Sequence, residues 1–365
     1  MDPQNAPTIC LSMIVKNEAH VLRRCLESVT PYIDHWIICD TGSTDTTADV
    51  ARQALADLPG AVHHHQWKDF GHNRTLALQL AAKTGCDYIL VIDADEWLVV
   101  EDPLVLAQLT EDAYRVEMRF PTISYPRVNL MRASRDWRYE GVIHEYPTCT
   151  PPAAEYLLTG LHMETDGQGA RGRSPDKAQR DLAVLERAVQ DEPNNPRYWF
   201  YLAQGYEVAG QIDAAIRAYT QRAGMGDYYE EVWYSHYRTA QLHVLKQEWD
   251  AAVLAYLRAF ETDPSRAEPL YWLALSYHNR GLDRLALIFL EAVCVIPEPH
   301  SALFVEPAVY QILRWIHYAV CLYNLGQLDD ARDMARKCVA SGKVPPQYLQ
   351  AVQRILDHPF VQVPA

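Results

Sequence analysis

The chain has 365 residues, of which 49% are hydrophobic and 22% are charged, and its formal net charge is −14. This length gives room for two domains with separate cores, and the acidic balance disfavours binding to nucleic acid or to an anionic membrane through a basic face. The eight cysteines are scattered without a CxxC pair, so we expect reduced thiols in a cytoplasmic protein. No apolar run is long enough for an integral membrane segment, and "MDPQNAP" at residues 1–7 does not predict a signal peptide.

The first half of the chain alternates strand-like and helix-like patterns. Strand-like runs at 8–15, 35–40, 61–67 and 88–95 are separated by helical patterns at 18–29, 45–55 and 73–85. This alternation predicts βαβ units and a mainly parallel sheet. Further strand-like runs follow without intervening helices at 113–122, 127–133, 141–148 and 156–164, which predicts an antiparallel extension of the sheet.

The second half reads as a helical repeat. A segment rich in Gly, Ser, Pro and Asp, "TDGQGARGRSPD" at 165–176, has no apolar periodicity and predicts a linker. Beyond it, the alanines at 215, 252, 286 and 331 recur at intervals of 37, 34 and 45 residues, which is typical of tetratricopeptide-like hairpins with one insertion around 296–307. We therefore expect a first domain at 1–165, a flexible linker or lid at 166–177, and a repeat domain at 178–365.

Acidic residues stand where the predicted strands end. "LVIDADEWL" at 90–98 places Asp93, Asp95 and Glu96 directly after a buried strand, and Glu18 and Asp40 follow the first and second strands. Open α/β sheets bind ligands at the carboxyl ends of their strands. Carboxylates this close repel one another and lose hydration, so we expect an external cation, and oxygen ligands favour Mn²⁺ or Mg²⁺. Glu18 can alternatively be a favourable first-turn acid of a helix.

Four motifs in a fixed order carry a family resemblance. They are "LSMIVKNEA", "ICDTGSTDTT", "DFGHNR" and "YILVIDADE", within residues 8–165. In this order they resemble the inverting nucleotide-sugar glycosyltransferases of the GT-A fold, of the large bacterial family 2 type. With the helical repeats attached, the layout is also similar to the S-glycosyltransferases that modify bacteriocin peptides such as sublancin. The resemblance implies an α/β GT-A domain followed by an all-α repeat array.

The same resemblance implies a site. The donor would be a nucleotide sugar, expected to be UDP-linked, and the acceptor would be a peptide, protein or glycan held by the repeats. Base and ribose would be bound by Glu18, Asp40 and Asp93, with further donor contacts from Asn73 and Arg74. The divalent metal, Mn²⁺ or Mg²⁺, would be bound by Asp95 and His162, with His144 as the alternative ligand. Glu145, in "GVIHE", would be the catalytic base, and His144 is its rival for that role. Arg171, Arg173 and Lys177 either close over the diphosphate as a lid or only solvate the linker.

Two other functions compete with this interpretation. One is a non-catalytic scaffold whose repeats bind a partner beside a degenerate sugar-nucleotide domain. The other is a glycosyltransferase that acts on a lipid or lipopolysaccharide, which the acidic charge disfavours. The intact DxD motif and the "HE" pair argue against the scaffold.

Overall fold

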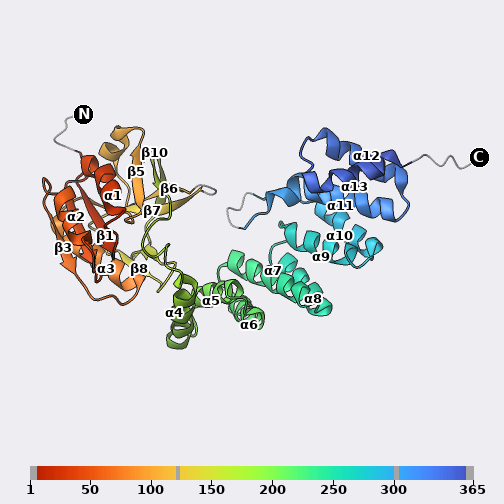
Figure 1. Ribbon diagram of the computed structural model, residues 1–365, viewed down its shortest axis with the longest axis horizontal. Coiled ribbons are helices and arrows are strands. Elements are labelled where there is room, and N and C mark those ends of the chain that lie inside the picture. The colour runs from red at the N-terminus through yellow and green to blue at the C-terminus, as the bar shows by residue number, and fades with distance from the viewer. Residues whose placement is uncertain (1–5, 121–123, 300–303, 359–365) are drawn as a thin grey trace, which may run out of the picture. The chain divides into compact units, whose positions relative to one another are not determined.

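The computed structural model describes residues 6–120, 124–299 and 304–358 (Figure 1). The chain divides into two compact units, Met1–Asp191 and Glu192–Ala365. The start of the N-terminal segment, residues 1–5, and residues 300–303 of the expected insertion lie outside the described residues. The domain limits at 165 and 178 stay a prediction. The division between compact units falls after Asp191, so the first helix beyond the linker is grouped with the sheet.

The first unit is built on a mixed sheet, which confirms the predicted α/β class. In the part of the chain that is described, an eight-stranded sheet has the order β3-β2-β1-β4-β7-β6-β10-β5, and β8 and β9 form a separate two-stranded sheet. Strands β1 to β4 are parallel, whereas β7 and β5 run antiparallel to their neighbours. The strands are β1 (Ile9–Val15), β2 (His35–Asp40), β3 (Gly60–His64), β4 (Tyr88–Val91), β5 (Glu96–Val100), β6 (Ala113–Arg119), β7 (Ser124–Arg132), β8 (Arg138–Glu140), β9 (Tyr146–Thr148) and β10 (Glu155–Thr165).

Helices cover both faces of the parallel part, because alternate side chains of each strand point to opposite faces. In β1, Leu11 and Met13 join the core that includes Leu22 and Leu26 of α1, whereas Cys10 joins the core of α3. The helices and shorter helical turns of this unit are α1 (Leu22–Val29), η2 (Thr30–Tyr32), α2 (Thr47–Ala54), α3 (Phe70–Ala81), η3 (Ala82–Thr84), η4 (Pro103–Gln108) and α4 (Lys177–Asp191).

One predicted strand is wrong in its first part. The run 141–148 forms β9 only at Tyr146–Thr148, and residues 141–145 form a loop between β8 and β9. The backbone turns there because φ is +107° at Gly141 and +53° at His144, and an extended strand does not allow these values. The loop docks on the start of α3, where a Cβ on Gly71 would lie 2.5 Å from the carbonyl oxygen of Gly141. Glycine at position 71 therefore permits this close approach.

The second unit is helical throughout its described residues. Consecutive helices form hairpins, and the repeat alanines Ala215, Ala252, Ala286 and Ala331 are all buried, which agrees with the predicted array. The helices are α5 (Pro196–Val208), α6 (Ile212–Gly224), α7 (Tyr229–Leu245), α8 (Trp249–Thr262), α9 (Glu268–His278), α10 (Asp283–Val295), η5 (Val309–Leu313), α11 (Arg314–Asn324), α12 (Leu328–Ala340) and α13 (Pro346–Asp357).

The turn inside each hairpin has the same backbone geometry. Five residues before each repeat alanine, a residue with positive φ ends the first helix: Gly210 (+70°), Gln247 (+60°), Gly281 (+73°) and Gly326 (+78°). Glycine adopts this left-handed conformation without steric cost, which explains its use at three of these turns. No helix among the described residues is long and apolar enough to cross a membrane.

Candidate active site

The predicted acids gather at one edge of the sheet. Strands β2, β1 and β4 are neighbours and parallel, so their carboxyl ends lie together. Asp40 is the last residue of β2, Glu18 lies three residues beyond β1, and Asp93 lies two residues beyond β4. The edge where ligands bind in open α/β sheets therefore carries carboxylates from three strands.

Arg74 joins two of the predicted site residues. From α3, its Nη2 donates to Asp93 Oδ1 at 2.6 Å and its Nε donates to Glu145 Oε1 at 2.7 Å. All three side chains are largely shielded from water. Burial raises the pKa of Asp93, but the nearby Arg74 and Arg127 outweigh it, so the pKa lies below its ordinary value. The guanidinium thus brings the candidate base next to the DxD motif.

Arg127 is a site residue that the sequence analysis missed. From β7, its Nη2 donates to Glu96 Oε2 at 2.7 Å, and its Nη1 lies 3.7 Å from Asp93 Oδ2. Burial raises the pKa of Glu96 despite this arginine. In the sequence, Arg127 is the first residue of the run 127–133, which also contains Asn129 and Arg132, so no pattern singles it out. Arginines of the chain therefore compensate Asp93 and Glu96, and the metal expected at Asp95 stays a prediction.

Asp95 and Glu18 have a different environment, because backbone amides bind them. Gly169 N donates to Asp95 Oδ2 at 3.1 Å, and Ala170 N donates to the two oxygens of Glu18 at 3.1 and 3.0 Å. Burial raises the pKa of both carboxyls; the charge of Asp95 raises the pKa of Glu18 further, and the charge of Asp93 raises the pKa of Asp95. A bound cation would therefore stabilise the ionised forms of Glu18 and Asp95 more than those of the acids already paired with arginines.

Residues 166–173, which we call the strap, lie across these acids. Arg24 Nη1 donates to Asp166 Oδ2 at 2.7 Å, and His20 Nε2 lies 2.8 Å from the carbonyl oxygen of Gln168. A Cβ on Gly169 would lie 2.8 Å from Asp95 Oδ2, so glycine lets the strap approach this carboxylate closely. The strap thus contacts Glu18 and Asp95, two of the predicted ligand-binding residues.

Asp40 and Asn73 bind the local backbone. Asp40 Oδ1 accepts from the amides of Gly42 and Ser43 at 2.9 and 2.7 Å, which forms the turn after β2. The buried amide of Asn73 donates to the carbonyl oxygen of Gln66 at 3.1 Å and accepts from Lys68 N at 2.9 Å. The amide nitrogen and the amide oxygen of Asn73 both bind the backbone of the loop before α3. In this structure Asn73 therefore holds that loop in place and does not face the ligand edge with a free group.

The structure does not bring His162 to Asp95. His162 of β10 pairs in antiparallel register with Val99, which is four residues beyond Asp95, or about 13 Å along a strand. Its ring nitrogens lie 3.2 Å from Glu101 Oε1 and 3.3 Å from Glu164 Oε1. The two residues thus lie apart along the strand in this structure, and a shared Asp95–His162 metal site stays a prediction. His144, the alternative ligand, is exposed in the loop at 141–145.

The three predicted lid cations lie on or beside the strap. Arg171 Nη2 donates to Asp181 Oδ1 of α4 at 2.6 Å, and its guanidinium lies 4.3 Å from the ring centroid of Phe70. Arg171 also helps to lower the pKa of Asp93 through its charge. Arg173 is exposed, and Lys177 is the exposed first residue of α4. Of the three, Arg171 is the one that the structure ties to the carboxylate edge.

The donor atoms at this edge fit a hard divalent cation. Asp95 offers carboxylate oxygens, and its raised pKa reflects a charge that the protein compensates poorly. Mg²⁺ in nucleotide sites is commonly bound by one or two carboxylates, with phosphate oxygens and water completing the shell. One carboxylate such as Asp95 would meet the protein's share of such a shell, and metal binding there stays a prediction.

A GT-A-like sheet with carboxylates at its strand ends, joined to a helical-hairpin array, defines a glycosyltransferase with attached repeats. Comparison with known families agrees. Residues 10–176 match the family "Glycosyl transferase family 2", and residues 170–229 match a tetratricopeptide repeat family.

Individual relatives extend this match. A TPR repeat-containing protein of Synechococcus elongatus is 30% identical over 301 residues, which covers 77% of this chain and 73% of that protein. The SPbeta prophage-derived glycosyltransferase SunS of Bacillus subtilis is 23% identical over 229 residues, covering 59% of this chain and 53% of SunS. A crystal structure of MamA superposes on 47% of this chain and 92% of its own, with 18% identity and a TM-score of 0.39. The chain therefore carries a glycosyl transferase family 2 domain at residues 10–176, followed by tetratricopeptide repeats, and the expected family resemblance is confirmed.

Proposed function

We propose that the protein is an inverting, metal-dependent glycosyltransferase that moves a sugar from a UDP-sugar to a peptide or protein acceptor. The observation that supports this most is the linkage of Glu145 to Asp93 through Arg74, because it unites the predicted base with the predicted donor-binding acids. Glu18, Asp40 and Asp93 bind the nucleoside of the donor. Asp95 would hold Mn²⁺ or Mg²⁺, and the bound ion would supply positive charge to the departing diphosphate.

Glu145 takes the proton of the acceptor nucleophile. Inversion requires the acceptor to attack the anomeric carbon on the face opposite the leaving group, with a base on the acceptor's side. Glu145 sits in the loop that docks on α3, and Arg74 fixes the direction of its carboxylate. Glu145 must present its second oxygen, Oε2, to the acceptor, because Oε1 accepts from Arg74.

The strap opens for the donor and then closes over it. Gly169 and Ala170 bind the same carboxylates that we assign to the metal and the nucleoside, so the donor has to displace their amides. After displacement, we assign Arg171 the contact with the diphosphate, because its charge already helps to lower the pKa of Asp93 at this edge. Arg173 and Lys177 extend the positive surface of the lid.

The substitution Glu145→Gln tests the proposal. It keeps the shape of the side chain and an oxygen acceptor for Arg74, but removes the basicity. We expect binding of UDP-sugar to be retained and sugar transfer to fall by roughly 10²–10⁴-fold, the usual contribution of a positioned base. Transfer is measured by the UDP released with acceptor present, and donor binding by calorimetry.

His144→Ala is the matched control in the neighbouring position, and we expect it to keep normal transfer. Normal transfer by Glu145→Gln together with loss in His144→Ala would assign the base to the histidine. Absence of UDP-sugar binding and hydrolysis in the wild-type protein with Mn²⁺ or Mg²⁺ would favour the non-catalytic scaffold.

A further inference from the structure

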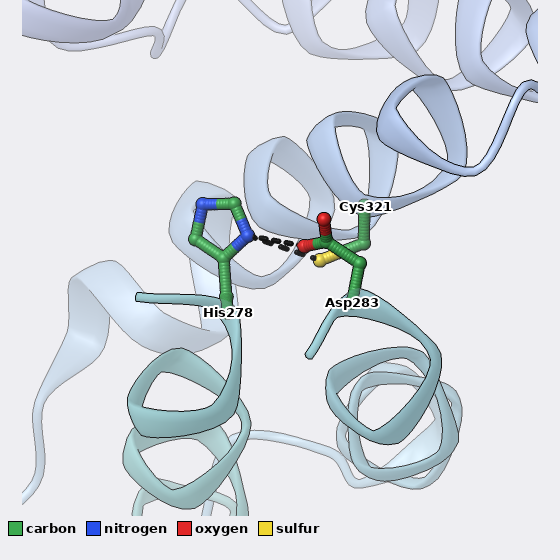
Figure 2. A group of neighbouring side chains, drawn as sticks. All are labelled: His278, Asp283 and Cys321. Carbon is green, nitrogen blue, oxygen red and sulfur yellow. Dashed lines mark hydrogen bonds and ion pairs between the residues drawn. The ribbon is translucent and has the colours of Figure 1, made fainter. Parts of the chain in front are cut away.

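Three side chains of the helical unit point toward one another across two repeats (Figure 2). His278 ends α9, Asp283 begins α10, and Cys321 lies in α11. His278 Nδ1 lies 2.5 Å from Asp283 Oδ1, and Cys321 Sγ lies 3.7 Å from the same nitrogen. One ligand atom from each residue falls within 4.8 Å of the others. We propose that these residues form a zinc site that links two adjacent repeats.

The kinds of ligand atom favour zinc. Imidazole nitrogen, carboxylate oxygen and thiolate sulfur are the three ligand types that Zn²⁺ takes in proteins, whereas Mg²⁺ and Mn²⁺ prefer oxygen alone. Three protein ligands leave the fourth tetrahedral position to water. Cys321 is fully buried, but 22% of the His278 side chain and 13% of the Asp283 side chain are exposed, so the ion and its water have access from that side.

The spacing of the ligand atoms is close to that of a tetrahedral zinc shell. With ordinary Zn–S and Zn–N bond lengths, sulfur and nitrogen are about 3.5 Å apart, near the observed 3.7 Å. The His278–Asp283 pair would spread from 2.5 Å to about 3.3 Å as the ion replaces the proton between them. Both side chains lie at helix ends, where a movement of less than 1 Å needs only small rotamer changes.

The geometry differs from that of a nucleophilic triad. In a triad, the histidine uses one ring nitrogen for the nucleophile and the other for the carboxylate. Here the sulfur and the carboxylate oxygen both face Nδ1, so they converge on one point and do not form a relay. Convergence on a single point is the arrangement that an ion requires.

The repeat itself does not require these residues. Asp283 stands three positions before its repeat alanine, and the matched positions of the other repeats hold Ile212, Trp249 and Leu328. Cys321 stands ten positions before its repeat alanine, where the others hold Gly205, Leu242 and Ser276. The ligand set is therefore an addition to one pair of repeats, and packing of the hairpin alone does not account for it.

Surrounding groups hold the ligands in place. Asn324 Nδ2 donates to the other oxygen of Asp283, Oδ2, at 3.0 Å, which leaves Oδ1 directed at His278. His317 is 6.2 Å away between ring centroids, and its Nδ1 contacts Tyr271 and Leu313, so it borders the site without being a ligand. Binding of Zn²⁺ releases the Cys321 thiol proton to solvent. A neutral His278 that carries its proton on Nδ1 moves it to Nε2, so the ligands are a thiolate and a neutral imidazole.

Cobalt substitution of the full-length protein provides the test. After removal of metal with a chelator, Co²⁺ is added, and the near-ultraviolet charge-transfer band of thiolate-bound Co²⁺ is recorded; Zn²⁺ is then titrated to displace it. We expect the wild-type protein to show this band at one Co²⁺ per chain. Cys321→Ser should lose the band, and His278→Gln should weaken Zn²⁺ binding by about 100-fold or more.

Two controls isolate the site. His243→Gln alters a similar histidine–carboxylate pair, His243 Nδ1 to Glu248 Oε2 at 2.7 Å, which joins α7 to α8 in the preceding hairpin. Asp95→Asn removes the metal ligand that we assign to the sheet unit. Both variants should keep the band, and Zn²⁺ should raise the unfolding temperature of each but not that of Cys321→Ser. Absence of the band in the wild-type protein, or its persistence in Cys321→Ser, would overturn the proposal.

Discussion

Individual residues at the sheet edge divide into two electrostatic groups. Asp93, Glu96 and Glu145 are paired with arginines, whereas Glu18 and Asp95 are bound by backbone amides. The acids themselves were predictable, because parallel strands end at the same edge and each acid follows a clear strand pattern. Their partner Arg127 was not, because it reaches the site through the antiparallel register of β7, which no local pattern specifies.

Asp95→Asn should change stability and binding in opposite directions. A carboxyl whose pKa is higher in the folded state than in the unfolded state costs stability once it is ionised. The cost is absent in acid, where both states are protonated, and is complete above the folded pKa. Asparagine removes the charge and still offers an oxygen to Gly169 N. We therefore expect the variant to be more stable at neutral pH, by on the order of 1 kcal/mol, and to lose metal-dependent nucleotide binding.

Urea unfolding at neutral and acidic pH measures the first effect, and the gain should vanish in acid. Asp176→Asn, which changes an exposed acid directly before α4, serves as the control. Equal stability of Asp95→Asn and wild type at neutral pH would mean that the strap amides already compensate the charge. Unchanged affinity for UDP with Mn²⁺ would remove Asp95 from the metal site.

At the scale of secondary-structure elements, the sequence pattern predicts the loops and turns less well than the helices and strands. The apolar alternation of 141–148 predicts a strand, but the positive φ values at Gly141 and His144 make its first part a loop. The segment at 165–176 has no apolar periodicity, so its pattern does not predict a contact with the site. The strap within it binds the site acids through backbone amides, which any residue other than proline can supply. Backbone contacts of this kind depend on chain geometry and have no residue code.

Gly169→Ala should loosen the strap. The added methyl group would lie 2.8 Å from Asp95 Oδ2 and 3.0 Å from Asp95 Cγ, so the strap or the carboxylate has to move. We expect faster tryptic cleavage at Arg171 and Arg173, since a lifted strap exposes these bonds. Gly224→Ala is the control, because a Cβ there meets nothing within 4 Å.

Cleavage rates are followed by mass spectrometry under conditions in which the protein stays folded. If Gly169→Ala and the wild-type protein are cut at the same rate, the strap does not depend on the close contact with Asp95. Equal acceleration in Gly224→Ala would point to a general loss of stability.

Across the whole molecule, the two compact units predict a division of labour between donor chemistry and acceptor binding. Some aromatic residues of the repeats, such as Trp233 and Tyr237, are buried in packing, but Tyr228 and Tyr229 at the start of α7 are 46% and 53% exposed. Exposed tyrosines are frequent anchors of bound peptides. Replacement of both by alanine should raise the KM for the acceptor by about tenfold and leave donor hydrolysis unchanged.

Initial rates with varied acceptor, and UDP release without acceptor, separate the two effects. Tyr156→Ala, which removes a similarly exposed tyrosine (47%) from the sheet unit, is the comparison. A proportional loss of hydrolysis and transfer in the Tyr228→Ala, Tyr229→Ala double variant would contradict the division of labour.

The left-handed turn that the hairpins share also affects where the repeat array begins to unfold. Three turns use glycine in the left-handed conformation, but Gln247 adopts it in the α7–α8 hairpin at a cost of about 1 kcal/mol. In a linear array, each repeat is stabilised chiefly by contacts with its neighbours. The conformational free energy lost at Gln247 therefore lowers the stability of its own hairpin and not that of the whole array. Sub-global opening should therefore start at the α7–α8 hairpin, and the repeats on either side of it behave as separate cooperative segments.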